Sequence, residues 1–338
     1  MAASPIDFGD GGQAKIQAPP AQLLELAFQP RYVHSHRGTL VQGENFWLGL
    51  GDDNQSPEGT KLEFQSGSQR RSFPVPLLPG QIYRLKCRVE ANRVELELDG
   101  KKLGSPGEAP RQFQGPYLVG CGSDPQDQFF GRIQSLRWDH LGWKQVRLAG
   151  GARWQAESPW PVHRRHLRFP FAAGSIWNVI QGFDTDGGSH RGYAAFCLDL
   201  KRPDLPRQTA GSLILAGARG RVVGLEQSLD SDSRESNRLG LQLPGGEVLD
   251  YLHFQRGSAR VREQQSVTAG QALAQVGDVG AGRGNHHLHL AWLSRERRPF
   301  VTLPFVLERF QASSDGGRSW TERRLALPAV GEWIRASP

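Results

Sequence analysis

Hydrophobic and polar residues alternate with a period of two over much of residues 23–141. The clearest stretch is residues 82–98, where every second residue is apolar on either side of a short polar turn. This pattern predicts a β-hairpin with one buried face, because successive side chains of a strand point to opposite sides. Shorter strand-like runs occur at residues 39–41, 46–50, 61–64, 117–119 and 129–138. Several short strands joined by turns are typical of an antiparallel sandwich or jelly roll.

The length of 338 residues and the changes of pattern along the chain predict two domains with separate cores. Residues 1–20 are rich in Gly, Ala and Pro and predict a disordered lead-in, followed by a β-sandwich domain at residues 21–142. Residues 143–170 contain three Trp and several Pro and predict an aromatic-rich connector. Residues 171–338 predict a second domain that is also largely β, so we expect an all-β chain.

Three segments of the first domain carry a resemblance to a known fold. Residues 78–85 would enter the central hairpin, residues 94–101 would return from it, and residues 130–137 would form a closing strand. Their order resembles the concanavalin-like, laminin-G-like jelly roll. The resemblance implies two antiparallel sheets in a fold whose members often bind glycans, so a glycan is one expected ligand of this domain. A spacer or interaction module is the alternative.

The chain has 41 Lys and Arg residues and 34 Asp and Glu residues, which gives a formal net charge of +7. This charge suits an anionic partner such as an envelope polymer, a membrane surface or a nucleic acid. Basic runs with interleaved aromatic residues are missing from the sequence, so we expect no nucleic-acid partner. No apolar run reaches 18 residues, so we expect no transmembrane segment.

The first residues lack the charged-then-apolar pattern of a signal peptide. Either the protein stays inside the cell, or Met1 precedes an already processed chain, and we expect the second.

The cysteines Cys87, Cys121 and Cys197 are far apart, without C-x-x-C spacing. At most one disulfide, Cys87–Cys121, is expected, and buried free thiols are the alternative.

Candidate chemistry concentrates in residues 285–290, Asn-His-His-Leu-His-Leu. On a strand His287 and His289 would project together into one cleft, since side chains at i and i+2 share a face. Neutral imidazole is a common zinc ligand and is suited to proton transfer near neutral pH. A polar strand end with surface histidines is the alternative.

A second cluster begins with a Gly-rich loop that bears His190 and leads into the apolar strand at residues 193–200, which carries Asp199. A carboxylate among apolar residues is costly unless it is paired or binds a metal. The alternative places Asp199 at the end of the strand, facing water. Further along, His253 lies in the apolar run at residues 248–254, where a lone histidine is more often part of the core than a catalyst.

Taken in order, residues 175–293 resemble the lysostaphin-type zinc metallopeptidases, most of which cut peptidoglycan cross-bridges or stem peptides. The resemblance rests on a His, an Asp on a strand, a Tyr-x-His, an Ala-Gly-Gln turn and a final His-x-His, all present in this order. Three departures occur: a nine-residue spacing between His190 and Asp199, His286 where Pro is usual, and Leu290-Ala291 in place of an aromatic and an acidic residue.

The resemblance implies a zinc ion held by His190, Asp199 and His289, with His253 and His287 as catalytic residues beside it. It also implies a secreted or periplasmic protein of the cell envelope that hydrolyses peptide bonds in peptidoglycan. Three alternatives stay open: a zinc protease acting on proteins, a catalytically silent regulator of other wall hydrolases, and a glycan-binding protein with an accessory peptidase domain.

Two further features have structural interpretations. Residues 313–320 match the Asp-box pattern, Ser-x-Asp-x-Gly-x-x-Trp, and predict a tight hairpin in a β extension at residues 300–338. His163 and His166 are spaced loosely like metal ligands, but their arginine-rich surroundings favour solvent exposure.

Overall fold

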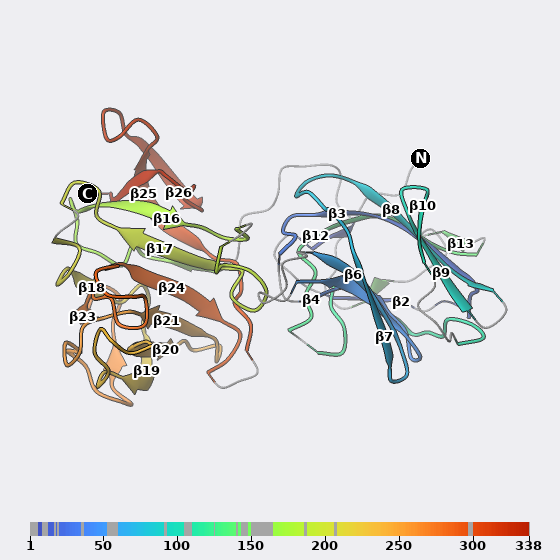
Figure 1. Ribbon diagram of the computed structural model, residues 1–338, viewed down its shortest axis with the longest axis horizontal. Helices are drawn as coiled ribbons and strands as arrows, with labels where there is room; N and C mark the ends of the chain where they lie inside the picture. Colours follow the sequence, from blue (N-terminus) through green and yellow to red (C-terminus); the bar gives the residue numbers. More distant parts are fainter. Residues whose placement is uncertain are drawn as a thin grey trace. The chain divides into compact units, whose positions relative to one another are not determined.

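The computed structural model contains 27 named elements in its described part, all of them strands, which confirms the all-β fold class (Figure 1). The described residues are 6–8, 13–16, 18, 20–34, 37–52, 60–90, 93–104, 110–124, 126–139, 141–142, 148–149, 165–185, 188–205, 208–296 and 300–337. The described residues form no helix that is long and apolar enough to cross a membrane. The chain divides into two compact units, Met1–Pro161 and Val162–Pro338.

The first unit contains two antiparallel sheets. In chain order its strands are β1 (Ile6–Asp7), β2 (Ala14–Ile16), β3 (Leu23–Pro30), β4 (Arg37–Gln42), β5 (Trp47–Gly51), β6 (Lys61–Ser66), β7 (Gln69–Pro74), β8 (Tyr83–Glu90), β9 (Arg93–Leu98), β10 (Lys101–Gly104), β11 (Tyr117–Val119), β12 (Gly131–Trp138), β13 (Leu141–Gly142) and β14 (Leu148–Ala149). One sheet has the order β1-β12-β3-β8-β9-β10, with β13 beside β12, and the other β14-β2-β11-β4-β5-β6-β7.

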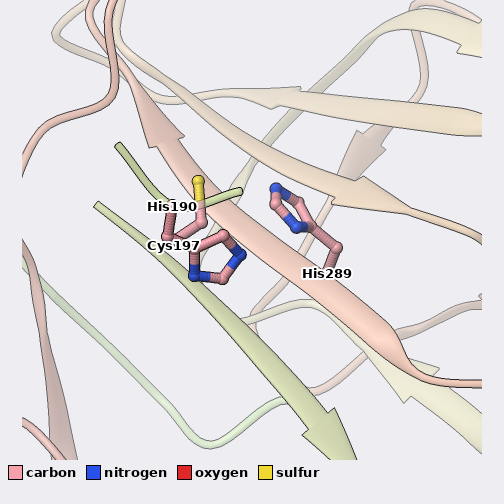
Figure 2. A group of neighbouring side chains, drawn as sticks. All are labelled: His190, Cys197 and His289. Carbon is pink, nitrogen blue, oxygen red and sulfur yellow. The ribbon is translucent and has the colours of Figure 1, made fainter. Parts of the chain in front are cut away.

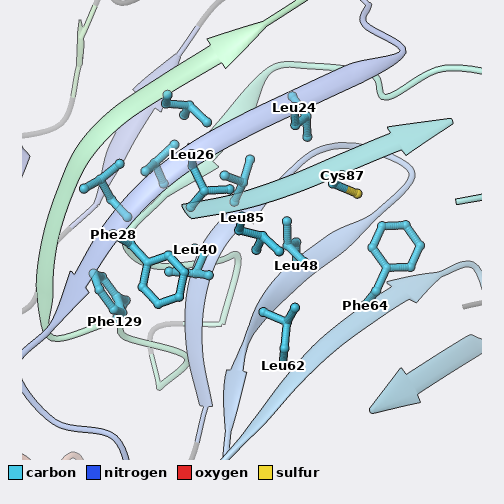
Figure 3. Close-up of a cluster of buried hydrophobic side chains, with 14 of the residues drawn as sticks. Leu24, Leu26, Phe28, Leu40, Leu48, Leu62, Phe64, Leu85, Cys87 and Phe129 are labelled. Atoms are coloured by element: carbon cyan, nitrogen blue, oxygen red, sulfur yellow. The ribbon is translucent and has the colours of Figure 1, made fainter. Parts of the chain in front are cut away.

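The two sheets share one hydrophobic core, which confirms the predicted sandwich. Alternate residues of β3 are buried, and Leu26 and Phe28 meet Leu48 and Phe64 of the other sheet in a single cluster (Figure 3). Burying one side chain of this size contributes roughly 1.5–3 kcal/mol, so the inner faces hold the sheets together. The predicted hairpin is the antiparallel pair β8–β9.

The disordered lead-in was wrong for part of residues 1–20, because β1 pairs with β12, β2 pairs with β11, and Phe8 is buried. Most of the predicted connector, residues 143–147 and 150–164 with His163, lies outside the described residues. All three cysteines are buried free thiols, so the alternative to a Cys87–Cys121 disulfide is the one observed.

The second unit is built on one large sheet. Its strands are β15 (His166–Leu167), β16 (Ile176–Gln181), β17 (Cys197–Lys201), β18 (Leu213–Leu215), β19 (Gly220–Glu226), β20 (Arg238–Gln242), β21 (Val248–Leu252), β22 (Ser266–Val267), β23 (Ala272–Gln275), β24 (Leu288–Leu293), β25 (Val306–Ser313), β26 (Thr321–Ala326) and β27 (Trp333–Ala336). The sheet order is β15-β25-β27-β16-β17-β24-β21-β20-β19-β22, with β26 beside β25 and a separate β18-β23 pair.

The middle of this sheet brings distant segments together. Figure 1 shows β17, β24 and β21 side by side, and β24 pairs antiparallel with both neighbours. The C-terminal strands belong to the same sheet, because β27 pairs with β16 and β25. In the turn between β25 and β26, the Asp315 carboxylate accepts hydrogen bonds from the backbone N–H groups of Arg318 and Ser319, as expected for a structural Asp-box. His166 is half-exposed and bound to Glu308.

Candidate metal centre

Strand pairing places Asp199 and His289 opposite each other. Their Cα atoms are direct partners across β17 and β24, and Oδ1 of Asp199 lies 2.9 Å from Nδ1 of His289. Both strands are apolar and mostly buried, so the sheet fixes these two polar side chains with little freedom. Two donor atoms therefore meet at one point above the central strands.

The loop between β16 and β17 brings in His190. Its side chain is fully buried, and Nδ1 lies 2.8 Å from the carbonyl oxygen of Gly182. A carbonyl only accepts hydrogen bonds, so Nδ1 carries the proton and Nε2 presents a lone pair. This Nε2 has no hydrogen-bond partner of good geometry, and it lies 3.3 Å from Oδ1 of Asp199.

Two of the three distances between these donor atoms are close to those of a zinc site. In a tetrahedral site with bonds of about 2.0–2.1 Å, two ligand atoms lie roughly 3.3 Å apart. The distances from Oδ1 of Asp199 to Nε2 of His190 and to Nδ1 of His289 are 3.3 and 2.9 Å. A buried lone pair directed at a carboxylate without a proton between them is costly, and a bound cation would satisfy both groups. Two imidazoles and one carboxylate are also a donor set that zinc prefers.

The metal-free charges of these groups are coupled. Burial alone would raise the pKa of Asp199, but the neighbouring His190 and His289 hold it well below the usual carboxyl range. Burial alone would lower the pKa of His289, but the neighbouring Cys197 and Asp199 raise it well above the ordinary value. Without metal, Asp199 and His289 therefore form an ion pair whose proton a cation would replace.

His253 and His287 lie beside this group. The ring of His253 has its centroid 4.7 Å from that of His287 and 5.7 Å from that of His289. Nε2 of His287 is 3.7 Å from Oδ2 of Asp199. Both residues lie just outside regular strands, since β21 ends at Leu252 and β24 begins at Leu288. The expected strand position of His253 was wrong: its φ of 68° is left-handed, a strained conformation often found at functional sites.

Backbone carbonyls orient both rings in the same way. Nδ1 of His253 lies 2.8 Å from the carbonyl oxygen of Val279, and Nδ1 of His287 lies 2.9 Å from that of Asn285. Each Nδ1 must therefore donate, which leaves Nε2 as a proton acceptor. Burial lowers the pKa of His253 to about 4 and also lowers that of His287, so both rings are neutral near pH 7.

Gly277 joins the two histidines through its backbone. Its N–H donates to the carbonyl of His253 at 2.9 Å, and its carbonyl accepts from the N–H of His287 at 3.2 Å. A Cβ at this position would lie 2.7 Å from the backbone nitrogen of Gln255, so only glycine fits. Sequence reasoning did not assign Gly277 a role, because the close approach depends on tertiary structure.

Two more residues near the site had no predicted role. Cys197 is buried, and burial raises the pKa of its thiol. Asp250, on β21, is buried and held by Nε of Arg238 at 2.7 Å. Burial raises the pKa of Asp250, and the Arg238 charge opposes that rise. The only sequence signal for either was a polar residue within an apolar strand.

Comparisons with known proteins give no match to a protein family or to a curated protein. Solved structures match parts of the chain in shape. The catalytic domain of the antimicrobial peptidase lysostaphin from Staphylococcus simulans overlaps 36% of this chain and 82% of its own, at 18% identity and a TM-score of 0.26. The catalytic domain of the prophage-encoded M23 protein EnpA from Enterococcus faecalis, as its A109H mutant, overlaps 40% of this chain and 94% of its own. The identity is 19% and the TM-score is 0.30.

A third solved structure also matches part of the chain in shape. A heptameric SAP-like pentraxin from Limulus polyphemus overlaps 44% of this chain and 92% of its own, at 13% identity and a TM-score of 0.36. All three TM-scores are below 0.5.

Proposed function

We propose that the second unit is a zinc-dependent endopeptidase, with His190, Asp199 and His289 as metal ligands and His253 and His287 as catalytic residues. The observation that carries this proposal is the convergence of two imidazole nitrogens on one carboxylate oxygen, at 3.3 and 2.9 Å. The ring of His253 contacts that of His289, with centroids 5.7 Å apart, and Nε2 of His287 lies 3.7 Å from Oδ2 of Asp199. Three protein ligands would leave a position on a bound zinc ion for water or substrate, as catalytic zinc sites require.

A zinc ion held by these residues would supply Lewis-acid chemistry, because zinc lowers the pKa of bound water toward neutrality and polarises a peptide carbonyl. His253 and His287 handle the protons. Each has an unprotonated Nε2 and an Nδ1 fixed to a backbone carbonyl, so each accepts one proton at a defined atom. One ring would accept a proton from the attacking water at Nε2. The other ring would stabilise the developing oxyanion, or supply the proton of the leaving amine, only after its own Nε2 has taken up a proton.

Peptidoglycan is the substrate that we propose, in an exported protein of the cell envelope. The formal net charge of +7 supports this choice, since it favours association with an anionic wall polymer. A glycan ligand for the sandwich of the first unit stays a prediction.

The test is digestion of purified peptidoglycan by the zinc-loaded full chain, with released fragments identified by mass spectrometry. New amino termini from wild type, and none from an Asp199→Asn variant, would support the proposal. Cleavage of glycine-rich or unfolded proteins without wall digestion would favour the protease alternative. Absence of any cleavage by a zinc-loaded chain, together with stimulation of another wall hydrolase, would favour the regulator and contradict the enzyme.

A further inference from the structure

The strand that carries Asp199 also carries a thiol two residues earlier. Cys197 and Asp199 share one face of β17, since side chains at i and i+2 of a strand point the same way. Cys197 is free and 1% exposed. Its Sγ and one ring nitrogen each of His190 and His289 all lie within 4.8 Å of one another, and Figure 2 shows the three side chains gathered together. The proposed hydrolytic reaction uses no thiol.

Two ligand sets therefore overlap and share both histidines. In the first set the third donor is Asp199, which faces Nδ1 of His289. In the second set the third donor is Cys197. His190 contributes its fully buried Nε2 to both ligand sets. This nitrogen has no hydrogen-bond partner, which is a separate indication that a cation binds here.

We propose that Cys197 gives this centre a second, thiolate-containing ligand set, His190–Cys197–His289, which holds thiophilic metal ions such as Cd²⁺. Thiolate sulfur is a soft donor, and soft ions prefer it to carboxylate oxygen. On binding, a sulfur–metal bond replaces the S–H bond, and the thiol proton leaves to solvent. The inference rests on the metal centre of the proposed function but not on its reaction.

The position of the thiol implies a consequence for activity. Cys197 packs with the apolar side chains of Val223, Val248, Ala291 and Leu293. An ion bound to Cys197 would be drawn from Asp199 toward these side chains and away from the proton-transfer groups. The second ligand set would therefore make the centre sensitive to thiophilic metals, which would occupy it without supporting hydrolysis.

The test is ultraviolet absorption of the metal-free full chain titrated with Cd²⁺ and Co²⁺, because a thiolate ligand produces an intense charge-transfer band. We expect the band to saturate at about one equivalent in wild type and in Asp199→Asn. Cys197→Ser and Cys197→Ala should lose the band and bind Cd²⁺ at least about tenfold more weakly, while zinc binding persists. Cys87→Ser is the matched control, since Cys87 is also a buried free thiol but belongs to the first unit, and it should keep the band.

The contradicting outcomes separate the two proposals. Stoichiometric Cd²⁺ and zinc binding without a charge-transfer band in wild type would overturn this inference and leave the proposed function standing. A band that survives in a folded Cys197→Ala variant would overturn it as well. Failure of the wild type to bind zinc, Co²⁺ or Cd²⁺ would overturn both proposals.

Discussion

Asp199 and His289 are 90 residues apart in sequence, yet their Cα atoms are direct partners across β17 and β24 and their side chains meet at 2.9 Å. The backbone pairing of two buried strands sets this relationship, so it does not depend on the side chains that meet there. Truncating either side chain should therefore remove a donor atom while the sheet stays paired. This makes the site testable by single substitutions.

Removal of either proposed catalytic imidazole should lower the rate of hydrolysis without lowering the zinc content. His253→Ala or His287→Ala should lower kcat/KM for peptidoglycan by about 100-fold or more, because one transition-state donor typically contributes about 2.7–4 kcal/mol. Zinc content should stay the same, since neither ring belongs to the proposed ligand set. His166→Ala is the control, as this half-exposed histidine is bound to Glu308. Full activity in either test variant would contradict the assigned roles.

Gly277→Ala should also lower kcat, because it displaces the two catalytic histidines instead of removing one of them. The added Cβ would lie 2.7 Å from the backbone nitrogen of Gln255, and the resulting shift would separate the backbone links to His253 and His287. We expect a destabilisation of about 1–3 kcal/mol in urea unfolding and a reduced kcat with zinc retained. A Cβ at Gly245 meets nothing within 4 Å, so Gly245→Ala is the matched control. An unchanged kcat in Gly277→Ala would argue against this role of the glycine.

The buried pair of Asp250 and Arg238 should show strong coupling. Arg238→Met leaves the buried Asp250 carboxylate without its partner at 2.7 Å, which should lower the free energy of unfolding by about 3 kcal/mol. The double variant with Asp250→Asn should recover most of this loss. Urea unfolding of the two single variants and the double variant measures the coupling. Additive effects would show that the two side chains act independently.

The first unit should become less stable as the pH rises through 6. Burial raises the pKa of Asp127 to about 6, although Nη1 of Arg37 lies 3.3 Å from its carboxylate and opposes the rise. The folded state therefore binds more protons than the unfolded state between about pH 4 and pH 6. The stabilisation is complete below this window and is lost as pH rises through it.

Relative to Asp127→Asn, the wild type should lose on the order of 1 kcal/mol of stability between about pH 5 and about pH 7. Urea unfolding at both pH values, followed by tryptophan fluorescence, measures the difference between the two proteins. A wild-type dependence identical to that of Asp127→Asn would contradict the raised pKa.

Local patterns allowed much of the fold to be predicted. The alternation at residues 82–98 predicted the β8–β9 hairpin, because period-two burial depends only on neighbouring residues. The strands β1 and β2 were missed, since two or three residues among glycines are too few to show a period. Strand β7 was missed because its side chains are mostly exposed, and its place comes from pairing with β6.

The sequence predicted which residues form the site but not how they are arranged in space. Ordered motifs named His190, Asp199 and His289, and the structure brings these three together. The left-handed φ of His253 and the approach of Cys197 could not be predicted, because they depend on loop conformation and on strand register over long distances in sequence.

Zinc content of the purified full chain is the most direct test of the central claim. After loading with zinc and removal of excess metal, the wild type should hold about one zinc per chain. His289→Ala and Asp199→Ala should each lose it, because each removes one of three donors, while His166→Ala should retain it. A wild type that takes up no zinc even from an excess of metal, or ligand variants that bind as much as wild type, would contradict the metal centre proposed for this protein.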